Sequence, residues 1–309
     1  MYGAMTGAGI SPRMVEPMES ADTRMQRVIS TYRYLNQTLT PAMLKGFSSA
    51  HIPAVEIFCS APHFDYRTEQ TVREMADCLS SNGLELHSLH APTERNLAHG
   101  RDNGAPLAIS EPERARRIEA IDEMKRALEV AERIPFRFFV VHMGGERQPA
   151  DERRLDAAFS ALEQMVLFAK QRGVVIALEN TPGELGAPAT LQQFIAQTHL
   201  RDLRLCFDTG HANIGDGIAA SFEVMRDLVV TTHIHDNHGD KDEHLVPFDG
   251  VIDWPAAFSL LATARQPLPV VLELKEQTAA APSVEQAVAA FDRLEREFEK
   301  PRTQAARTS

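Results

Sequence analysis

Short apolar runs alternate with longer segments in which apolar residues recur every three or four positions. Each run is five to seven residues long and rich in Val, Ile, Leu and Phe, which is typical of strands buried in a parallel sheet. The runs are Val28–Tyr32, Ala54–Phe58, Leu84–His90, Phe136–His142, Val174–Glu179, Leu203–Asp208, Leu228–His233 and Val270–Leu274. The first run is the weakest of these eight predicted strands.

The segments between the runs carry the signals of amphipathic helices. Thr40 followed by Pro41 is typical of a helix start. A capping box at Ser110–Glu113 predicts a helix that reaches about Ile134, and Ser283–Gln286 begins the last helix. The predicted buried stripes are Ile118, Ile121, Met124 and Leu128; Leu155, Phe159, Leu162, Val166 and Ala169; and Val284, Ala287, Phe291, Leu294 and Phe298.

This alternation predicts an α/β fold, a (β/α)8 TIM barrel that forms a single domain. From Tyr32 to Glu273 the seven strand-to-strand units span 241 residues, or about 34 residues each, which matches the length of such barrels. A doubly wound open sheet is the rival, but the glycine-rich phosphate turn typical of that fold is not visible in the sequence. We expect a flexible N-terminal tail over residues 1–25, the barrel over 26–300 and a C-terminal tail over 301–309.

Composition narrows the classes of function. The 309 residues are 43% hydrophobic and 24% charged, as in an ordinary globular protein. No apolar run approaches the roughly 18 residues of a membrane span. Three scattered cysteines without a Cys-x-x-Cys spacing favour a reducing, cytoplasmic location over a disulfide framework. The formal net charge of −11 disfavours a polyanionic partner such as nucleic acid.

Ionisable residues lie at the ends of six predicted strands. They are His90, His142, Glu179, Asp208, His233 and Glu273, from the third to the eighth run. The carboxyl ends of barrel strands converge on one mouth, where the active sites of this fold lie. A single histidine at a strand end is usually just a hydrogen-bonded residue. Six residues of metal-ligand type on consecutive strands indicate a metal site.

The loops after the strands supply further candidates. They are His211, Asp242 and His244 as additional metal or substrate-binding residues, with His63 and His235 as weaker substrate-binding candidates. His235 lies two residues after His233 and shares its strand face, so it is also the reserve ligand. Carboxylates and imidazoles without thiolates suit an open, catalytic site for Zn, Mn, Co or Fe rather than a closed structural zinc site.

Six short motifs lie in matching order on the predicted strands. They are Ser88–Pro92, Val141–Gly144, Leu178–Gly183, Phe207–His211, His233–Asp236 and Leu272–Leu274. Together they resemble the xylose isomerase-like TIM-barrel group, which includes sugar-phosphate isomerases and epimerases, inosose dehydratases and endonuclease IV. The resemblance covers about residues 27–298. Each motif alone is weak, and their order and placement carry the resemblance.

The resemblance implies a set of metal ligands. In the ketose 3-epimerases of this group a Glu, an Asp, a His and a second Glu hold one divalent metal, here Mn, Zn, Co or Mg, and the matching residues are Glu179, Asp208, His233 and Glu273. Endonuclease IV holds three zinc ions with nine ligands, and the other five positions match His90, His142, His211, Asp242 and His244. The sequence departs from the epimerases at Gly239, where they carry a substrate-binding arginine.

These features favour a metal-dependent sugar or sugar-phosphate isomerase or epimerase. Such an enzyme removes a proton beside a carbonyl and passes through an enediolate, so Glu179 and Glu273 are the expected catalytic residues. A divalent metal acting as Lewis acid would stabilise the negative charge. Three alternatives remain: a dehydratase or other lyase on the same scaffold, an endonuclease IV-like multi-zinc phosphodiesterase, and a sugar-binding module without catalysis.

The expected partner is a small sugar or polyol, and a homo-oligomer remains open. The loop over residues 91–109 is too long for a simple barrel connection, and we expect it to act as a lid. Static packing of this loop on a neighbouring subunit is the alternative. Its Arg95 and Arg101 are balanced by Glu94 and Asp102, so it forms no clear basic patch for DNA.

Overall fold

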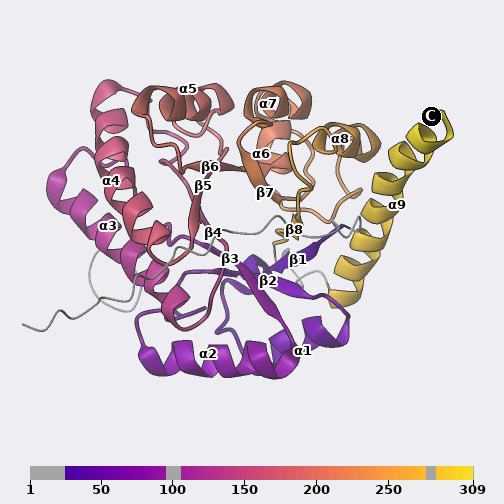
Figure 1. Ribbon diagram of the computed structural model, residues 1–309, viewed down its shortest axis with the longest axis horizontal. Helices are drawn as coiled ribbons and strands as arrows, with labels where there is room; N and C mark the ends of the chain where they lie inside the picture. The colour runs from indigo at the N-terminus through magenta and orange to yellow at the C-terminus, as the bar shows by residue number, and fades with distance from the viewer. Residues whose placement is uncertain (1–24, 95–105, 276–282, 309) are drawn as a thin grey trace, which may run out of the picture.

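Every predicted apolar run forms a parallel strand in the computed structural model. It describes residues 25–94, 106–275 and 283–308, and for residues 298–308 the backbone alone. The strands are β1 (Arg27–Ser30), β2 (Ala54–Phe58), β3 (Glu85–His90), β4 (Phe138–Val141), β5 (Val175–Glu179), β6 (Arg204–Asp208), β7 (Val229–His233) and β8 (Val270–Leu272). Helices surround them on the outside (Figure 1), which confirms the predicted single-domain (β/α)8 TIM barrel.

The strands lie in the sheet in chain order, β7-β6-β5-β4-β3-β2-β1-β8. The ring closes through the residue that follows β7. The amide of Ile234 donates to the carbonyl of Val271 at 2.8 Å, and the amide of Glu273 donates to the carbonyl of Ile234 at 3.2 Å. All strand pairs are parallel, so the carboxyl ends of the strands meet at one mouth.

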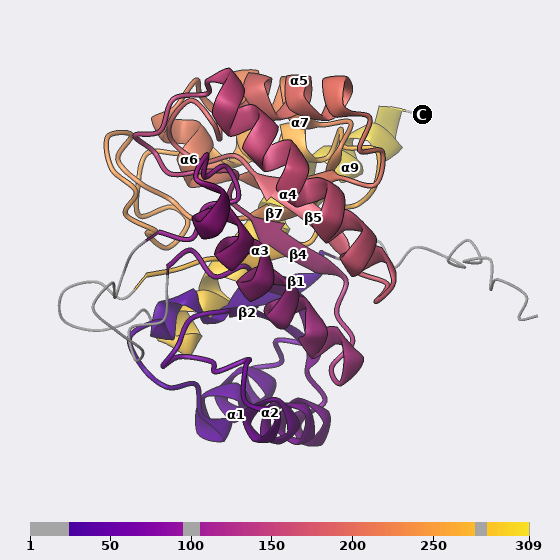
Figure 2. The same ribbon diagram turned by 90° about the vertical axis from the view of Figure 1, so that its left-hand side faces the viewer.

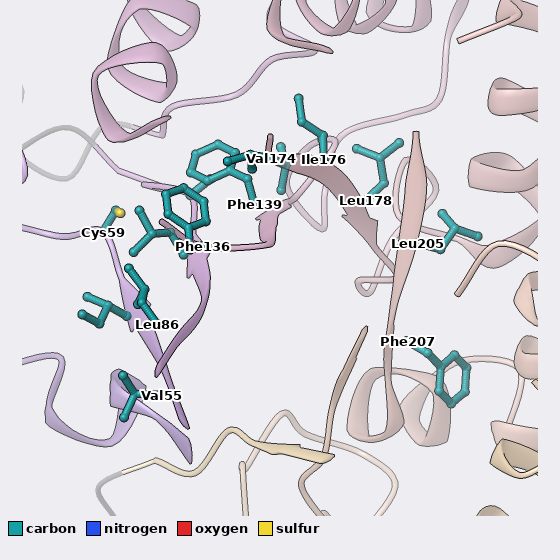
Figure 3. Close-up of a cluster of buried hydrophobic side chains, with 14 of the residues drawn as sticks. Val55, Cys59, Leu86, Phe136, Phe139, Val174, Ile176, Leu178, Leu205 and Phe207 are labelled. Carbon is teal, nitrogen blue, oxygen red and sulfur yellow. The ribbon is translucent and has the colours of Figure 1, made fainter. Parts of the chain in front are cut away.

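The main core lies between the strands and the helices. Figure 3 shows Val55, Leu86, Phe139, Ile176 and Leu205 directed away from the barrel centre toward the surrounding helices. In Figure 2, α3 (Arg114–Glu129) and α4 (Glu152–Lys170) run beside each other over β4 and β5. This apolar shell fixes the strand ends, and therefore the mouth, in space.

Two clusters of small side chains lie inside the barrel. Val28, Ala54 and Val271 form one buried cluster, and Val140, Ala177 and Cys206 form another. Val271, Ala177 and Cys206 each lie two residues before a predicted ligand and therefore share its strand face. These side chains pack inside the barrel directly beneath the residues of the mouth.

The other helices are α1 (Pro41–Ser49), α2 (Glu69–Asn82), α5 (Pro188–Thr198), α6 (Thr209–Ile214), α7 (Ile218–Met225), α8 (Trp254–Leu261) and α9 (Val284–Thr308), with 3-10 turns at Thr31–Tyr34 and Val130–Glu132. Two predicted starts are confirmed. Thr40 caps α1 by accepting from the Met43 amide at 3.4 Å. Ser283 and Gln286 exchange hydrogen bonds of 2.7 and 3.2 Å before α9. None of the described helices combines the length and the low polarity that crossing a membrane requires.

The predicted capping box at Ser110 is wrong. Helix α3 begins only at Arg114, and the side chain of its N-cap residue, Glu113, makes no capping bond. Ser110 is instead fully buried, and Arg117 donates to two backbone carbonyls ahead of the helix, at 2.7 and 3.1 Å. Ile118 also leaves the predicted stripe and is 45% exposed.

Four sequence predictions concern residues that the structure does not describe in full. Most of the N-terminal tail, residues 1–24, lies outside them, as do residues 95–105 of the expected lid. The backbone of positions 301–308, assigned to a C-terminal tail, continues helix α9. The side chain of Phe298 is also not described.

Candidate active site

The six predicted strand-end residues gather at the barrel mouth. His90, Glu179, Asp208 and His233 are the last residues of β3, β5, β6 and β7, while His142 and Glu273 directly follow β4 and β8. All but His142 are buried. Their ligand atoms form overlapping clusters, each with all its atoms within 4.8 Å of one another. A site of this kind is possible because parallel strands deliver side chains from distant parts of the chain to one place.

Glu179, Asp208, His233 and Glu273 form the central cluster, which we call the four-ligand centre. Nδ1 of His233 lies 3.1 Å from Oε1 of Glu179, 3.4 Å from Oε2 of Glu273 and 3.9 Å from Oδ2 of Asp208. Neither Nδ1 of His233 nor Oε1 of Glu179 has a hydrogen-bond partner among the described residues. Buried atoms left without partners around one point, with three carboxylates and an imidazole as donors, fit a divalent cation.

His90 and His142 form a second cluster with the other oxygen of Glu179. Oε2 of Glu179 lies 3.3 Å from Nε2 of His90 and 3.1 Å from Nε2 of His142. The two histidine nitrogens lie 3.2 Å apart. Glu179 therefore faces two potential metal positions, one with each carboxylate oxygen.

A third cluster adjoins the four-ligand centre. It consists of His211, His235, Asp242 and His244. Oδ2 of Asp242 lies 2.9 Å from Nε2 of His244 and 3.5 Å from Nε2 of His211. His235, the reserve ligand, places Nε2 3.0 Å from Asp208, so it connects this cluster to the four-ligand centre.

Backbone carbonyls orient three of the histidine rings. Nδ1 of His90 donates to the carbonyl of Ala91, Nδ1 of His211 to that of Asn180, and Nδ1 of His244 to that of Glu273, each at 2.9 Å. In all three rings Nε2 then faces the cluster as a lone-pair donor. Fixing a ligand histidine through its second nitrogen is the usual arrangement in metal sites.

The turn after β6 is shaped by close contacts. Oδ1 of Asp208 accepts from the amide of His211 at 2.7 Å and so caps α6, while the other oxygen faces His235. A side chain at Gly210 would place its first carbon 1.9 Å from the His235 ring. Asp208 therefore caps α6 in addition to occupying a predicted ligand position. The close contact with His235 leaves room only for glycine at position 210.

Asp236 organises the loop that brings Asp242 and His244 to the mouth. Its carboxylate is fully buried and accepts four hydrogen bonds, from the amides of Asn237, Phe248 and Ile252 and from the indole of Trp254, at 2.8 to 3.1 Å. In Figure 2 this orange loop after β7 lies at the same end of the barrel as α6. This role of Asp236 was not predicted from the sequence.

The carboxylates of the four-ligand centre have opposed pKa shifts. Burial alone would raise the pKa of Glu179, but the adjacent His233 and His142 hold it well below its usual range. Burial also raises the pKa of Glu273, and here His233 does not compensate, because the charges of Glu179, Glu56 and Asp208 add to the effect of burial and hold the pKa well above its usual range. Three crowded carboxylates repel one another, and a divalent cation is the group that would balance their charge.

A cavity of about 280 Å³ opens above these clusters. Its polar wall includes Glu179, His211 and Glu273, and its apolar wall includes Tyr32 and Phe58. The rings of Tyr32 and Phe58 lie 5.3 Å apart. The sequence did not predict this aromatic wall, although Tyr32 and Phe58 are the last residues of the first two apolar runs.

Other histidines lie away from the cavity. His63 is buried, and its ring nitrogens contact the carbonyl of Gln37 at 2.8 Å and the hydroxyl of Thr31 at 2.9 Å. It has no nitrogen free for a substrate, so the structure does not bring this weak candidate into the site. His51 and His199 are exposed, whereas His87 is buried inside the barrel.

Glu56 is a further polar residue that the sequence analysis missed. It lies in the middle of β2, is fully buried and contacts Nε2 of His233 at 3.1 Å. Its signal in the sequence is a charged residue inside the apolar run Ala-Val-Glu-Ile-Phe.

The sequence profile described as "Xylose isomerase-like TIM barrel" matches residues 48–296. The chain belongs to this family. Relatives of the xylose isomerase-like barrel include an uncharacterised protein of Methanocaldococcus jannaschii, 28% identical over 237 residues, covering 73% of this chain and 75% of the relative. A probable endonuclease 4 of Haloquadratum walsbyi is 24% identical over 182 residues, covering 51% of this chain and 63% of the relative.

Solved structures of similar fold include named sugar epimerases. A D-tagatose 3-epimerase-like protein superposes with a TM-score of 0.74 at 25% identity, covering 91% of this chain and 100% of that chain. The IolI protein with a bound zinc atom superposes with a TM-score of 0.72 at 16% identity, covering 89% and 99%. This xylose isomerase-like barrel is therefore similar both to an epimerase-like protein and to a probable endonuclease 4.

Proposed function

We propose that this barrel is a divalent-metal-dependent isomerase or epimerase of a small sugar or sugar phosphate. The observation that carries the proposal is that Glu179 and Glu273 belong to one four-ligand centre and line the same small cavity. The cavity volume is near the lower end for small-molecule sites, which suits a monosaccharide. The epimerase-like structural relative supports the same class of reaction.

The side chains supply the elements of proton transfer. Glu179 and Glu273 come from strands β5 and β8 and reach the cavity from different sides, so one can remove a proton beside the carbonyl while the other returns it. Their oppositely shifted pKa values are typical of carboxylate pairs that divide acid and base roles. His142 and His211 face the same cavity and can hold substrate hydroxyls.

The four-ligand centre would hold the cation, with Glu179, Asp208, His233 and Glu273 as its ligands. Mn, Zn, Co or Mg suits oxygen ligands combined with a single imidazole. Bound there, the cation would supply Lewis-acid stabilisation of negative charge on a substrate oxygen. The aromatic wall of Tyr32 and Phe58 would pack against the carbon face of a sugar and exclude water.

Solvent-proton exchange tests the proposal. Ketoses, aldoses, their phosphates and inososes are incubated with the metal-loaded protein in heavy water, and deuterium beside the carbonyl is measured by NMR. We expect incorporation with at least one substrate and none with metal-stripped protein. Loss of water from an inosose would instead identify the dehydratase alternative. No exchange with any compound, with the metal bound, would contradict the proposal.

A multi-metal phosphodiesterase is the second candidate, favoured by one specific observation. The nine positions carried over from endonuclease IV all lie in three adjoining clusters, two of which share Glu179. The probable endonuclease 4 relative agrees with this. The formal net charge of −11 opposes a DNA partner. Cleavage of an abasic-site duplex by protein with three zinc ions per chain, without proton exchange on sugars, would decide for this candidate.

A further inference from the structure

Glu56 makes an unusual contact inside the barrel. Its Oε2 lies 3.1 Å from Nε2 of His233 and accepts a hydrogen bond of 2.8 Å from the hydroxyl of Ser88. Oε1 has no hydrogen-bond partner among the described residues. Both carboxylate and ring are completely buried. Glu56 therefore lies on the opposite side of the His233 ring from the four-ligand centre.

His233 differs from the other ligand-type histidines in how its ring is held. His90, His211 and His244 donate from Nδ1 to backbone carbonyls and present Nε2 to their clusters. His233 has the reverse orientation: Nε2 faces the Glu56 carboxylate, and Nδ1 faces Glu179 and Glu273. It is the one histidine of the four-ligand centre and is oriented by a charged partner.

We propose that Glu56 is a positioning residue that fixes His233 as an Nδ1 ligand. A carboxylate that accepts the Nε2 proton leaves the lone pair on Nδ1, which faces the four-ligand centre. It also makes the imidazole a stronger donor, as carboxylate–histidine–metal arrangements do. Glu56 does not line the cavity, and His233 is the residue of the four-ligand centre that it contacts, so it acts through His233. The inference rests on the proposed metal site.

The burial of Glu56 supports this role. Among the described residues no Lys or Arg side chain pairs with it, and its hydrogen-bond partners are His233 and Ser88. A buried carboxylate without a cationic side chain and with one oxygen unpartnered is destabilising unless another charge compensates it. A cation at the four-ligand centre, connected through His233, would provide that charge.

Metal affinity of matched variants tests the inference. Glu56→Gln keeps an acceptor oxygen but loses the charge, whereas Glu56→Leu also removes the acceptor. The control is Glu123→Gln, which removes another buried carboxylate that binds Arg67 and Arg126 between the outer helices. Zinc affinity is measured by competition with a chromophoric chelator. We expect Glu56→Gln to weaken binding about 10- to 100-fold, Glu56→Leu to weaken it further, and Glu123→Gln to leave it unchanged.

Nitrogen-15 NMR of the histidines in the zinc-loaded wild type is a second readout that needs no destabilising variant. His233→Asn identifies the His233 signals. We expect the Nε2–H tautomer with zinc on Nδ1, and the opposite tautomer would overturn the inference. Equal zinc affinity of the wild type and both Glu56 variants would also overturn it while leaving the metal site intact. A wild-type chain that binds no divalent metal would overturn the proposed function itself.

Discussion

The indole Nε1 of Trp254 donates a hydrogen bond of 2.8 Å to Oδ2 of Asp236. This bond ties the start of α8 to the end of β7, and the loop between them carries Asp242 and His244. Asp236→Asn replaces one carboxylate oxygen, which accepts two of the four hydrogen bonds, by an amide group that only donates. We expect it to destabilise the protein by about 2–4 kcal/mol and to lower metal occupancy chiefly at the third cluster.

Urea unfolding and elemental analysis measure the two effects of Asp236→Asn. Asp253→Asn is the matched control, because its exposed side chain only caps α8 by accepting from the Ala256 amide. It should keep full metal content. If Asp236→Asn also keeps full metal content and stability, the loop is held by other contacts.

Glu179 belongs both to the four-ligand centre and to the cluster with His90 and His142, whereas Glu273 belongs to the four-ligand centre alone, which predicts unequal effects of their removal. We expect Glu179→Gln to lose more metal per chain than Glu273→Gln. Both should reduce solvent-proton exchange about 10²–10⁴-fold, because each removes a base. Glu243→Gln, beside Asp242 but outside the clusters, should change neither quantity. If the metal-loaded Gln variants exchange protons at the wild-type rate, Glu179 and Glu273 are not the catalytic bases.

Asp208 combines a ligand position with a helix cap, so two substitutions separate its roles. Asp208→Ala should lose the metal and also the cap of α6, a cost of about 0.5–2 kcal/mol in metal-free protein. Asp208→Asn should lose the metal while keeping the cap acceptor. Asp151→Ala removes the cap of α4 alone and should retain the metal. Equal stabilities of metal-free Asp208→Ala and Asp208→Asn would show that the cap contributes nothing.

His87 should make the protein sensitive to acid. Burial lowers its pKa to about 4, from an ordinary 6.5, while its Nε2 lies 3.2 Å from the hydroxyl of Thr231. Between these pH values the unfolded chain binds a proton that the folded protein does not, so stability falls as pH decreases through this window. Between pH 7 and 4.5, we expect the free energy of unfolding of His87→Gln to fall by about 2 kcal/mol less than that of the wild type.

Urea unfolding of His87→Gln at both pH values checks this. His199→Asn replaces an exposed histidine and should follow the wild type. The same loss of stability in wild type and His87→Gln would mean that other groups, such as the mouth carboxylates, cause the acid sensitivity.

The barrel and most of its mouth can be predicted from the sequence alone. Strand length, apolar composition and spacing define the eight strands, and parallel strands in a closed ring must bring their carboxyl ends together. Glu179 and Asp208 could therefore be placed at one site from their positions at strand ends alone. The strand-end histidines His90 and His233 followed for the same reason.

The pairing of side chains across the barrel, in contrast, depends on the complete three-dimensional fold. Ser110 has the local signal of a helix cap but is buried ahead of the helix. The ring nitrogens of His63 make hydrogen bonds with the segment that follows β1. Glu56 lies 177 positions from His233 in the chain, and nothing local indicates that they touch. Contacts across the barrel depend on ring closure and on the register of every strand between the two residues. These are properties of the whole sheet, and no short segment of sequence contains them.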